Sequence, residues 1–213
     1  KAAEMVADKY KDQLMVNTGT IPQKEGDPQN PYFNIWGTTD MSGTPEVILW
    51  RQYSKELGVV NNVEVGVQHG DFGVGLTRSM VEGYVMKDGK PIYNSAYTYS
   101  DQTIADVATN RDPRLTIFLK VPGQKNVFKN MSAPEDHYVI DEPYPTITTR
   151  NAENDYSTGY AIRKGGTFDK ANTGNGNCYN AAEIFRATEA LLNYMEAEYM
   201  LTNSLSGKVL EYW

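Results

Sequence analysis

The feature that most restricts the fold of this chain is a strongly apolar segment close to its end, AAEIFRATEALLNYMEAEYM, residues 181–200. If this segment is helical, with about 100° between successive residues, its large apolar side chains cover roughly half of the helix surface: Ile184, Phe185, Leu191, Leu192, Met195 and Tyr199. The sector left for water is narrow and carries Arg186, Glu189, Asn193 and Glu196. A helix with so much apolar surface normally packs between other helices, so the segment predicts a helical body around it.

The sequence offers one other strong helical pattern, in residues 2–16, AAEMVADKYKDQLMV. Its apolar face consists of Ala3, Val6, Ala7, Tyr10 and Leu14. A single helix of this kind can cover only part of the apolar stripe around Leu191 and Met195. We therefore expect both terminal helices to belong to a larger helical scaffold, of which this chain is a fragment.

Short strands and one tight turn are predicted between the two helices. The continuous apolar run EVILW (46–50) is typical of a buried strand. Leu115, Ile117 and Leu119 alternate as in a second strand. The dipeptide Asp88-Gly89 lies between apolar residues and predicts a hairpin turn, because glycine accepts positive φ.

Much of the remaining chain is predicted to be loop. Residues 58–77 are dominated by Gly, Val and Asn, and residues 122–180 are rich in Pro, Asn, Gly and Thr. Connections this long are usually functional or belong to something larger. The expected fold class is mainly α, with long irregular loops and short β-hairpins. It comprises the end of a helical scaffold (1–20), a loop-rich ligand face with short strands (21–180), and a late scaffold helix with its tail (181–213).

Charge and composition argue against several classes of function. The 27 acidic and 20 basic residues give a net charge of −7, which disfavours nucleic-acid binding. No apolar run approaches the roughly 20 residues of a membrane-spanning helix. Cys178 is the single cysteine, so an internal disulfide framework is excluded, and the opening KAAEMVADKY contains no targeting segment, as expected of a processed or truncated piece. The 15 tyrosines suit a polar recognition surface.

Several stretches, taken in order, resemble the C-terminal half of the SusD/RagB family of bacterial outer-membrane nutrient-binding proteins. They are AAEMVADKYKDQLMV (2–16), GTPEVILWRQY (43–53), MVEGYVMKDGKPI (80–92) with NRDPRL (110–115), and STGYAIRK (157–164) leading into IFRATEALLNYMEAEYMLTNS (184–204). The family's lipidated N-terminal cysteine, its signal peptide and most of its early helices have no counterpart here. Thr188 and Met195 also stand where the family often has alanine.

The resemblance implies a non-catalytic surface lipoprotein of the bacterial outer membrane, held there by a lipid anchor that this chain lacks. Such proteins cover a TonB-dependent, SusC-like transporter and deliver oligosaccharides or other nutrients to it. A tetratricopeptide-like helical scaffold carries a loop-rich ligand face, and no cofactor or metal is implied.

Glycan capture needs flat aromatic rings that pack on sugar faces and polar groups that bond hydroxyls. The predicted strand at 46–50 is followed by such side chains, and the Gly-rich stretch after it adds more. The candidate ligand-binding residues are Trp50, Arg51, Tyr53, His69, Asp71, Phe72 and Arg78. The competing interpretation is that Trp50 belongs to the core and the others line ordinary loops.

Other functions have weaker support. The only histidines are His69 and His137, which limits catalytic triads and histidine-based metal sites. A carboxylate pair for glycoside hydrolysis is not excluded, because acidic residues are plentiful, so a glycoside hydrolase or an accessory piece of one is the alternative. The segment NAENDY (151–156) is rich in oxygen ligands but lacks the EF-hand spacing for calcium. A third possibility is an interaction domain that seals a transporter without touching ligand.

Overall fold

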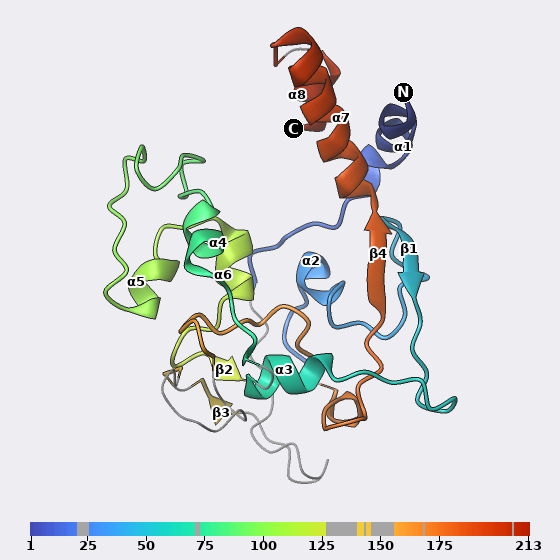
Figure 1. Ribbon diagram of the computed structural model, residues 1–213, viewed down its shortest axis with the longest axis vertical. Helices are drawn as coiled ribbons and strands as arrows, with labels where there is room; N and C mark the ends of the chain where they lie inside the picture. Colours follow the sequence, from blue (N-terminus) through green and yellow to red (C-terminus); the bar gives the residue numbers. More distant parts are fainter. Residues whose placement is uncertain are drawn as a thin grey trace.

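The computed structural model describes residues 1–20, 26–70, 73–126, 140–142, 144–145, 156–167, 169–205 and 207–213. This part of the chain is mostly helical (Figure 1). Its α-helices are α1 (Ala2–Tyr10), α2 (Pro31–Asn34), α3 (Val63–His69), α4 (Arg78–Gly83), α5 (Ile104–Ala108), α6 (Pro113–Phe118), α7 (Ala187–Thr202) and α8 (Lys208–Tyr212). Its strands are β1 (Val47–Arg51), β2 (Lys125–Asn126), β3 (Ile140–Asp141) and β4 (Ala182–Arg186). None of these helices has the length and apolar character that crossing a bilayer requires.

The larger of the two small sheets joins segments far apart in the sequence. A strand is present where the sequence predicts one, but it is not buried as expected, since Leu49 is 52% exposed. Strand β1 pairs antiparallel with β4, so that Leu49 lies opposite Phe185 and Trp50 opposite Glu183. The prediction of helix from residue 181 onward is therefore wrong for residues 182–186. The backbone of Arg186 is extended and helix α7 begins only at Ala187. Cross-strand pairing of apolar side chains stabilises this part of the segment as a strand.

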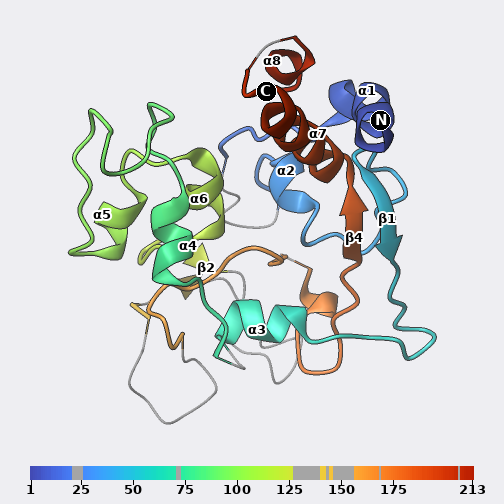
Figure 2. The ribbon, with the colours of Figure 1, turned by 45° about the horizontal axis from the view of Figure 1, so that its top comes forward.

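Helix α7 packs against α1 and α8, and the three helices project beyond the β1–β4 sheet (Figures 1 and 2). Their core contains Ala7, Ala187, Leu191 and Tyr212, with Tyr10, Leu14, Tyr194 and Met195 against it. The expectation that Leu191 and Met195 lack a mate within this chain is thus wrong. The sequence reasoning missed α8, and helix α1 ends at Tyr10, short of the predicted residue 16, with a 3-10 turn η1 (Lys11–Gln13) after it.

A second group of apolar side chains, on α7, α8 and the residues next to them, remains exposed. Leu192 is 52% exposed and Met200 is 77% exposed. Leu201, Leu205, Leu210 and Trp213 are also exposed. The apolar stripe is therefore covered from within on one side only.

Two neighbouring leucines of α7 test this division. Leu191→Ala is expected to lower the free energy of unfolding by about 2–3 kcal/mol, because it leaves a cavity in the α1–α7–α8 core. Leu192→Ala should change it by less than about 0.5 kcal/mol, because that side chain is already in water. Urea unfolding measures both losses. Equal losses would contradict the assignment of Leu191 to a buried side of α7 and of Leu192 to an exposed side.

The prediction of a strand through Leu115, Ile117 and Leu119 is also wrong, because these residues form helix α6 and its end. The side chain of Asp112 accepts a hydrogen bond from the backbone N–H of Arg114 and caps the helix, and Pro113 supplies a suitable φ at the first helical position. The helix directs Leu115 and Leu119 into one core cluster. Ile117 and Phe118 enter another, with Phe33.

Helix α3 replaces part of the loop predicted at 58–77. Two of its valines, Val65 and Val67, are buried, and the helix ends at Gly70, whose φ is +80°. β-branched residues and the internal Gly66 weaken the helical signal in the sequence, and tertiary burial overrides it. The hairpin-type turn at Asp88-Gly89 is confirmed: Gly89 has φ +74°, and Met86 N–H donates to Lys90 O at 2.8 Å.

Helices α4, α5 and α6 form a lobe opposite α7 (Figures 1 and 2). Arg111 holds this lobe together from inside. Its guanidinium is buried and donates to the carbonyl oxygens of Val81 (2.5 Å) and Tyr84 (2.9 Å). The guanidinium thus links α4 to the segment that precedes α6.

Candidate functional site

The α4–α6 lobe carries a groove of about 340 Å³ that combines aromatic and polar side chains; we call it the Tyr160 groove. One side is the segment that leads into α5, and the other is the turn at residues 158–160. Its lining residues are Asp101, Gln102, Thr103, Ile104, Val107, Tyr144, Pro145, Thr158, Gly159 and Tyr160.

A capping box holds the first side of the groove. Thr103 precedes α5, and its hydroxyl accepts a hydrogen bond from Asp106 N–H at 3.1 Å. The Asp106 carboxylate in turn accepts from Thr103 N–H at 3.1 Å. This reciprocal arrangement stabilises the start of a short helix. It keeps Asp101 and Gln102 in front of α5, where both are exposed.

Close backbone packing holds the other side. Leu76 N–H donates to Tyr160 O at 2.9 Å, and the Tyr160 side chain packs against the buried cluster that contains Val81 and Val107. A Cβ atom at Gly75 would collide with Oγ1 of Thr158, so only glycine lets the two segments approach this closely. The tyrosine ring and the Thr158 hydroxyl are therefore presented from a rigid support.

Arg78 supplies charge next to the Tyr160 groove. Its guanidinium donates from Nε to Glu82 at 2.6 Å and from Nη2 to Asp101 at 2.8 Å. The hydrogen bond to Glu82, and then the negative charges of Glu82 and Asp101, raise the pKa of Arg78. Among the predicted ligand residues whose side chains the structure describes, Arg78 contacts a lining residue of this groove, Asp101.

The predicted ligand residues in and after β1 do not line the Tyr160 groove. Trp50 is half-buried and packs on the cluster of Ile35, Met41 and Ala181. The Arg51 guanidinium lies 5.0 Å from the centre of the Tyr53 ring, where the strand ends. Strand β1 and helix α4 are on opposite sides of the molecule (Figures 1 and 2), so the structure does not bring Arg78 together with this group.

His69 is the last residue of α3, while Asp71 and Phe72 lie outside the described residues. Beside α3 runs a wider groove of about 750 Å³, lined by Asn62, Val63, Gly66, Val67, Gly73, Val74, Gly75 and Ile162. No aromatic ring is among these lining residues. Asn62 is engaged with Asn175 and Gly176 through hydrogen bonds of 2.9 and 2.7 Å. This groove offers less to a polar, ring-shaped ligand than the Tyr160 groove does.

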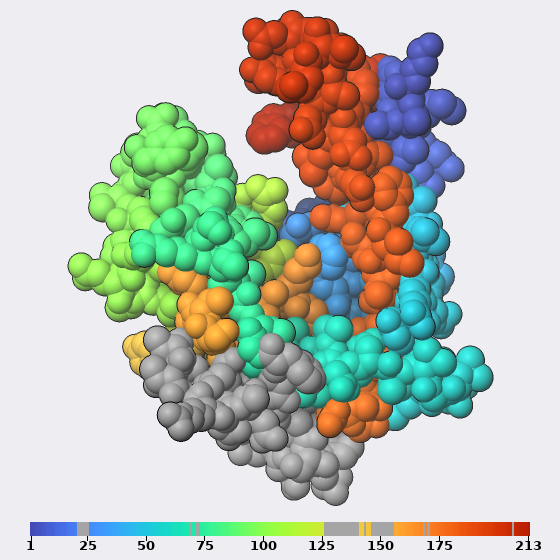
Figure 3. Space-filling model, in the orientation of Figure 1, coloured from blue at the N-terminus to red at the C-terminus, as the bar shows by residue number. Residues whose placement is uncertain are grey.

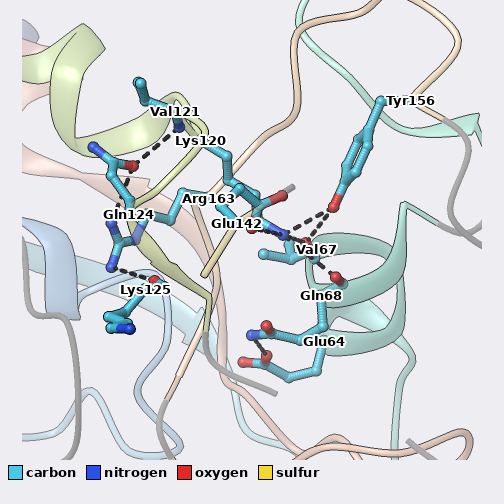
Figure 4. Close-up of polar contacts among 10 residues, drawn as sticks. All are labelled: Glu64, Val67, Gln68, Lys120, Val121, Gln124, Lys125, Glu142, Tyr156 and Arg163. Atoms are coloured by element: carbon cyan, nitrogen blue, oxygen red, sulfur yellow. Dashed lines mark hydrogen bonds and ion pairs between the residues drawn. The ribbon is translucent and has the colours of Figure 1, made fainter. Parts of the chain in front are cut away.

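A buried polar network lies between α3 and the loop after α6 (Figure 4). Lys120 Nζ donates to Val67 O at 2.5 Å and to Tyr156 Oη at 2.8 Å, and lies 3.7 Å from Glu142. Burial lowers the pKa of Lys120 to about 8 and raises that of Glu64 to about 8. The enclosed cavity beside Lys120 is about 10 Å³, roughly one water, so the network is structural and not a ligand site.

Metal binding has no geometric support in the described ranges, where no three His, Cys, Asp or Glu side chains converge. Five of the six residues of the calcium hypothesis at 151–156 lie outside those ranges. Cys178 is buried, and burial raises the pKa of its thiol.

Sequence reasoning missed Tyr160, Tyr144, Asp101 and Thr158. A local signal existed in STGYAIRK, where Gly159 and Tyr160 follow two hydroxyl residues, as at a turn that presents polar groups. What the sequence does not reveal is that this turn faces the residues before α5.

Residues 35–212 match the SusD family. The chain belongs to the SusD family. This confirms the resemblance noted in the sequence and, with the observed helices, the mainly helical SusD-like fold.

Solved structures share the fold of this SusD-family chain. A SusD-like protein from Bacteroides fragilis NCTC 9343 is 23% identical, with a TM-score of 0.55, and the match covers 93% of this chain and 39% of that one. The selenomethionine form of BT4246 is 17% identical, with a TM-score of 0.51, over 92% of this chain and 39% of that one. The SusD-family chain thus spans about two-fifths of the length of these structures. No curated protein sequence matches it.

Proposed function

We propose that this SusD-family chain binds oligosaccharides without chemical turnover and that the Tyr160 groove is part of its ligand face. The observation that carries the proposal is the convergence of two tyrosines with carboxylate, amide and hydroxyl groups in one groove of about 340 Å³. Family membership supports carbohydrate binding for transport as the general role.

The chemistry of the groove suits a sugar. Tyr160 and Tyr144 offer flat apolar ring faces, which pack against the C–H side of a pyranose. Asp101, Gln102 and Thr158 offer acceptors and donors for hydroxyl groups. Because the groove is open and wet, we expect micromolar or weaker affinity. Trp50, Arg51 and Tyr53 at the end of β1 stay a prediction for a second contact region.

The cellular setting is also proposed from the family. The whole protein would be a surface lipoprotein of the outer membrane that passes its ligand to a TonB-dependent, SusC-like transporter. Residues 1–20 and 181–213 would belong to its helical scaffold, and residues 21–180 would form most of the ligand face. The exposed apolar surface of α7 and α8 supports a further packing partner for that scaffold.

A glycoside hydrolase remains the alternative, and the acidic residues give it little support. A general acid needs a raised pKa and access to substrate. Among the described acids, Glu64 has a raised pKa but is fully buried, bonded to Gln68 and Asn180. Burial also raises the pKa of Glu183, which lies 3.3 Å from Arg186. Glu82 and Asp101, beside the groove, are both paired with Arg78. Labelled oligosaccharides separate the two functions: retention without new reducing ends supports binding, and turnover contradicts it.

Tyr160→Ala is expected to weaken oligosaccharide binding at least about tenfold, because a central aromatic contact is worth more than 1 kcal/mol. Isothermal titration against an oligosaccharide panel measures the change. Tyr93→Ala is the matched control, since Tyr93 is 87% exposed and does not line the groove, and it should bind as the parent does.

The same panel tests the other interpretations. Parent-like binding by Tyr160→Ala would contradict the groove as a ligand site. If Trp50→Ala or Tyr53→Ala loses binding instead, the end of β1 is the site. If the parent retains no glycan at all, the interaction-domain interpretation is favoured, consistent with the exposed apolar surface of α7 and α8.

A further inference from the structure

A cluster of aromatic rings lies where α2 meets α6. None of its residues lines the Tyr160 groove. Trp36 packs edge-on against Tyr32 and Phe118, with centroid separations of 6.4 and 6.2 Å. Phe33 stacks on Phe118 at 6.2 Å. The molecule is hollowed between the α4–α6 lobe and the wall of β4 and α7, with α2 at the base of the hollow (Figure 3).

Three cationic side chains surround these rings. Lys164 Nζ is 3.5 Å from the centre of the Trp36 ring, and the Arg186 guanidinium is 5.0 Å from it. The Arg163 guanidinium is 5.8 Å from the centre of the Phe33 ring. Ring faces attract cations, but they do not replace a counter-ion.

The two arginines have polar partners. Arg186 donates to Glu46 at 2.7 Å and lies 3.3 Å from Glu183. Arg163 reaches Gln124 Oε1 and Lys125 O, each at 3.5 Å. Both guanidinium groups are therefore held by the protein itself.

Lys164 differs from both. It is half-buried, and its ammonium makes no hydrogen bond and no ion pair within 4.0 Å to any side chain or backbone group of the described ranges. Burial, and then repulsion from Arg186, lower the pKa of Lys164. The negative charge of Glu183 opposes this shift without forming an ion pair with Lys164. A half-buried cation in this position would be stabilised further by an anion that pairs with it directly.

Two further polar atoms of the same cluster lack partners in the described part of the chain. The indole Nε1 of Trp36 and the second carboxylate oxygen, Oε2, of Glu183 are buried without a hydrogen bond. Unpaired buried polar atoms are uncommon and each calls for an explanation. Together with Lys164, they offer two donors and one acceptor around an aromatic ring, which matches a group bearing a carboxylate and a neighbouring hydroxyl.

We propose that Lys164, Trp36 and Glu183 form a second binding site that takes a carboxylate-bearing ligand. The carboxylate pairs with Lys164 Nζ, Trp36 Nε1 donates a hydrogen bond, and Glu183 accepts from a hydroxyl of the ligand. This site shares no lining residue with the Tyr160 groove, and its main ligand contact is a cation. It can therefore be tested independently of the function proposed for that groove. The carboxylate can come from a uronic acid or from a free organic acid.

The test compares sodium galacturonate, galactose and sodium acetate by isothermal titration at constant ionic strength. The parent should bind galacturonate at least tenfold more tightly than galactose. Lys164→Met should lose at least tenfold in galacturonate affinity, and Lys164→Arg should stay within about threefold of the parent. Binding of acetate as tight as that of galacturonate would identify the free acid as the source, and weaker binding of acetate would identify the uronic acid.

Control variants distinguish a loss of binding at this site from a loss of folding and from binding elsewhere. Lys164→Met keeps an unbranched side chain without the charge, and its thermal unfolding should match the parent. Trp36→Phe keeps a ring but removes Nε1, and should weaken galacturonate binding without abolishing it. Tyr93→Ala, at an exposed position that lines neither site, should leave galacturonate binding unchanged. Equal affinity for galactose and galacturonate, parent-like binding by Lys164→Met, or a crystal structure in which only water meets Trp36 Nε1 in the presence of galacturonate would each overturn the proposal.

Discussion

Glu46→Gln is expected to lower the free energy of unfolding by about 3–5 kcal/mol, the usual loss when one partner of a buried ion pair is removed. Glu46 is 1% exposed, and its carboxylate accepts three hydrogen bonds. They come from Met15 N–H (2.6 Å), Arg186 Nη1 (2.7 Å) and the Thr188 hydroxyl (2.5 Å). An amide in this place satisfies fewer donors and removes the closer of the two carboxylates that pair with Arg186, leaving Glu183 at 3.3 Å. Urea unfolding, monitored by circular dichroism, measures the loss.

The loss of stability in Glu46→Gln should depend on the burial of the ion pair. Asp101→Asn breaks an ion pair of similar length, with Arg78 at 2.8 Å, but both side chains there are well exposed. Exposed pairs contribute at most about 1 kcal/mol, so this control should stay close to the parent. Comparable losses in the two variants would contradict the assignment of Glu46 as the carboxylate that joins the segment after α1, the start of β1 and the β4–α7 junction.

The Glu46 contacts also show what the sequence could and could not predict. Strand β1 was predictable because EVILW is a continuous apolar run, and α1 and α7 because their apolar residues repeat with a helical period. Nothing in the sequence near Glu46 indicates that its partners lie 140 and 142 residues away, at Arg186 and Thr188. The strand character of residues 182–186 depends on that distant pairing, so local periodicity extended α7 too far.

Short apolar segments were predicted less well, for a related reason. Leu115, Ile117 and Leu119 fit a strand by alternation, yet Asp112 and Pro113 start a helix there. A run of five or six residues satisfies either period, and the capping residues then decide. The start signal, Asp112 followed by Pro113, was present in the sequence.

The candidate site was predictable only in part. Arg78 was identified from its residue type and lies beside Asp101. Tyr160 was not, because the groove arises where the chain near Gly75 meets the turn at Thr158. The close approach of these two segments is a tertiary feature without a local pattern. Aromatic and polar residue types indicate recognition in general, and only the fold shows which of them converge.

In the buried network behind α3, Glu64 and Lys120 change the free energy of unfolding in opposite directions as pH rises. Burial raises the pKa of Glu64 from its ordinary 4.5 to about 8, so the folded state holds a proton that the unfolded state releases. The contribution of Glu64 to the free energy of unfolding is fully present below pH 4.5 and is lost as pH rises to about 8. Burial lowers the pKa of Lys120 from 10.5 to about 8, so its unfavourable contribution is relieved between pH 8 and 10.5. Both effects place the stability minimum of this network near pH 8.

Glu64→Gln should remove the first of these effects. Gln68 Nε2 and Asn180 Nδ2 donate to the two carboxyl oxygens of Glu64 at 2.9 and 2.8 Å, and the amide, like the neutral acid, keeps one carbonyl acceptor for them. At pH 5 the variant should be about as stable as the parent. At pH 8 it should be more stable by on the order of 4 kcal/mol, since each pKa unit is worth about 1.4 kcal/mol. Urea unfolding at pH 5, 6.5 and 8 measures the difference, with Glu196→Gln, at an exposed position of α7, as the matched control. Parallel pH profiles for Glu64→Gln and the parent would show that Glu64 is ionised in the folded protein, and that the network is stabilised by a buried charge rather than by a buried proton.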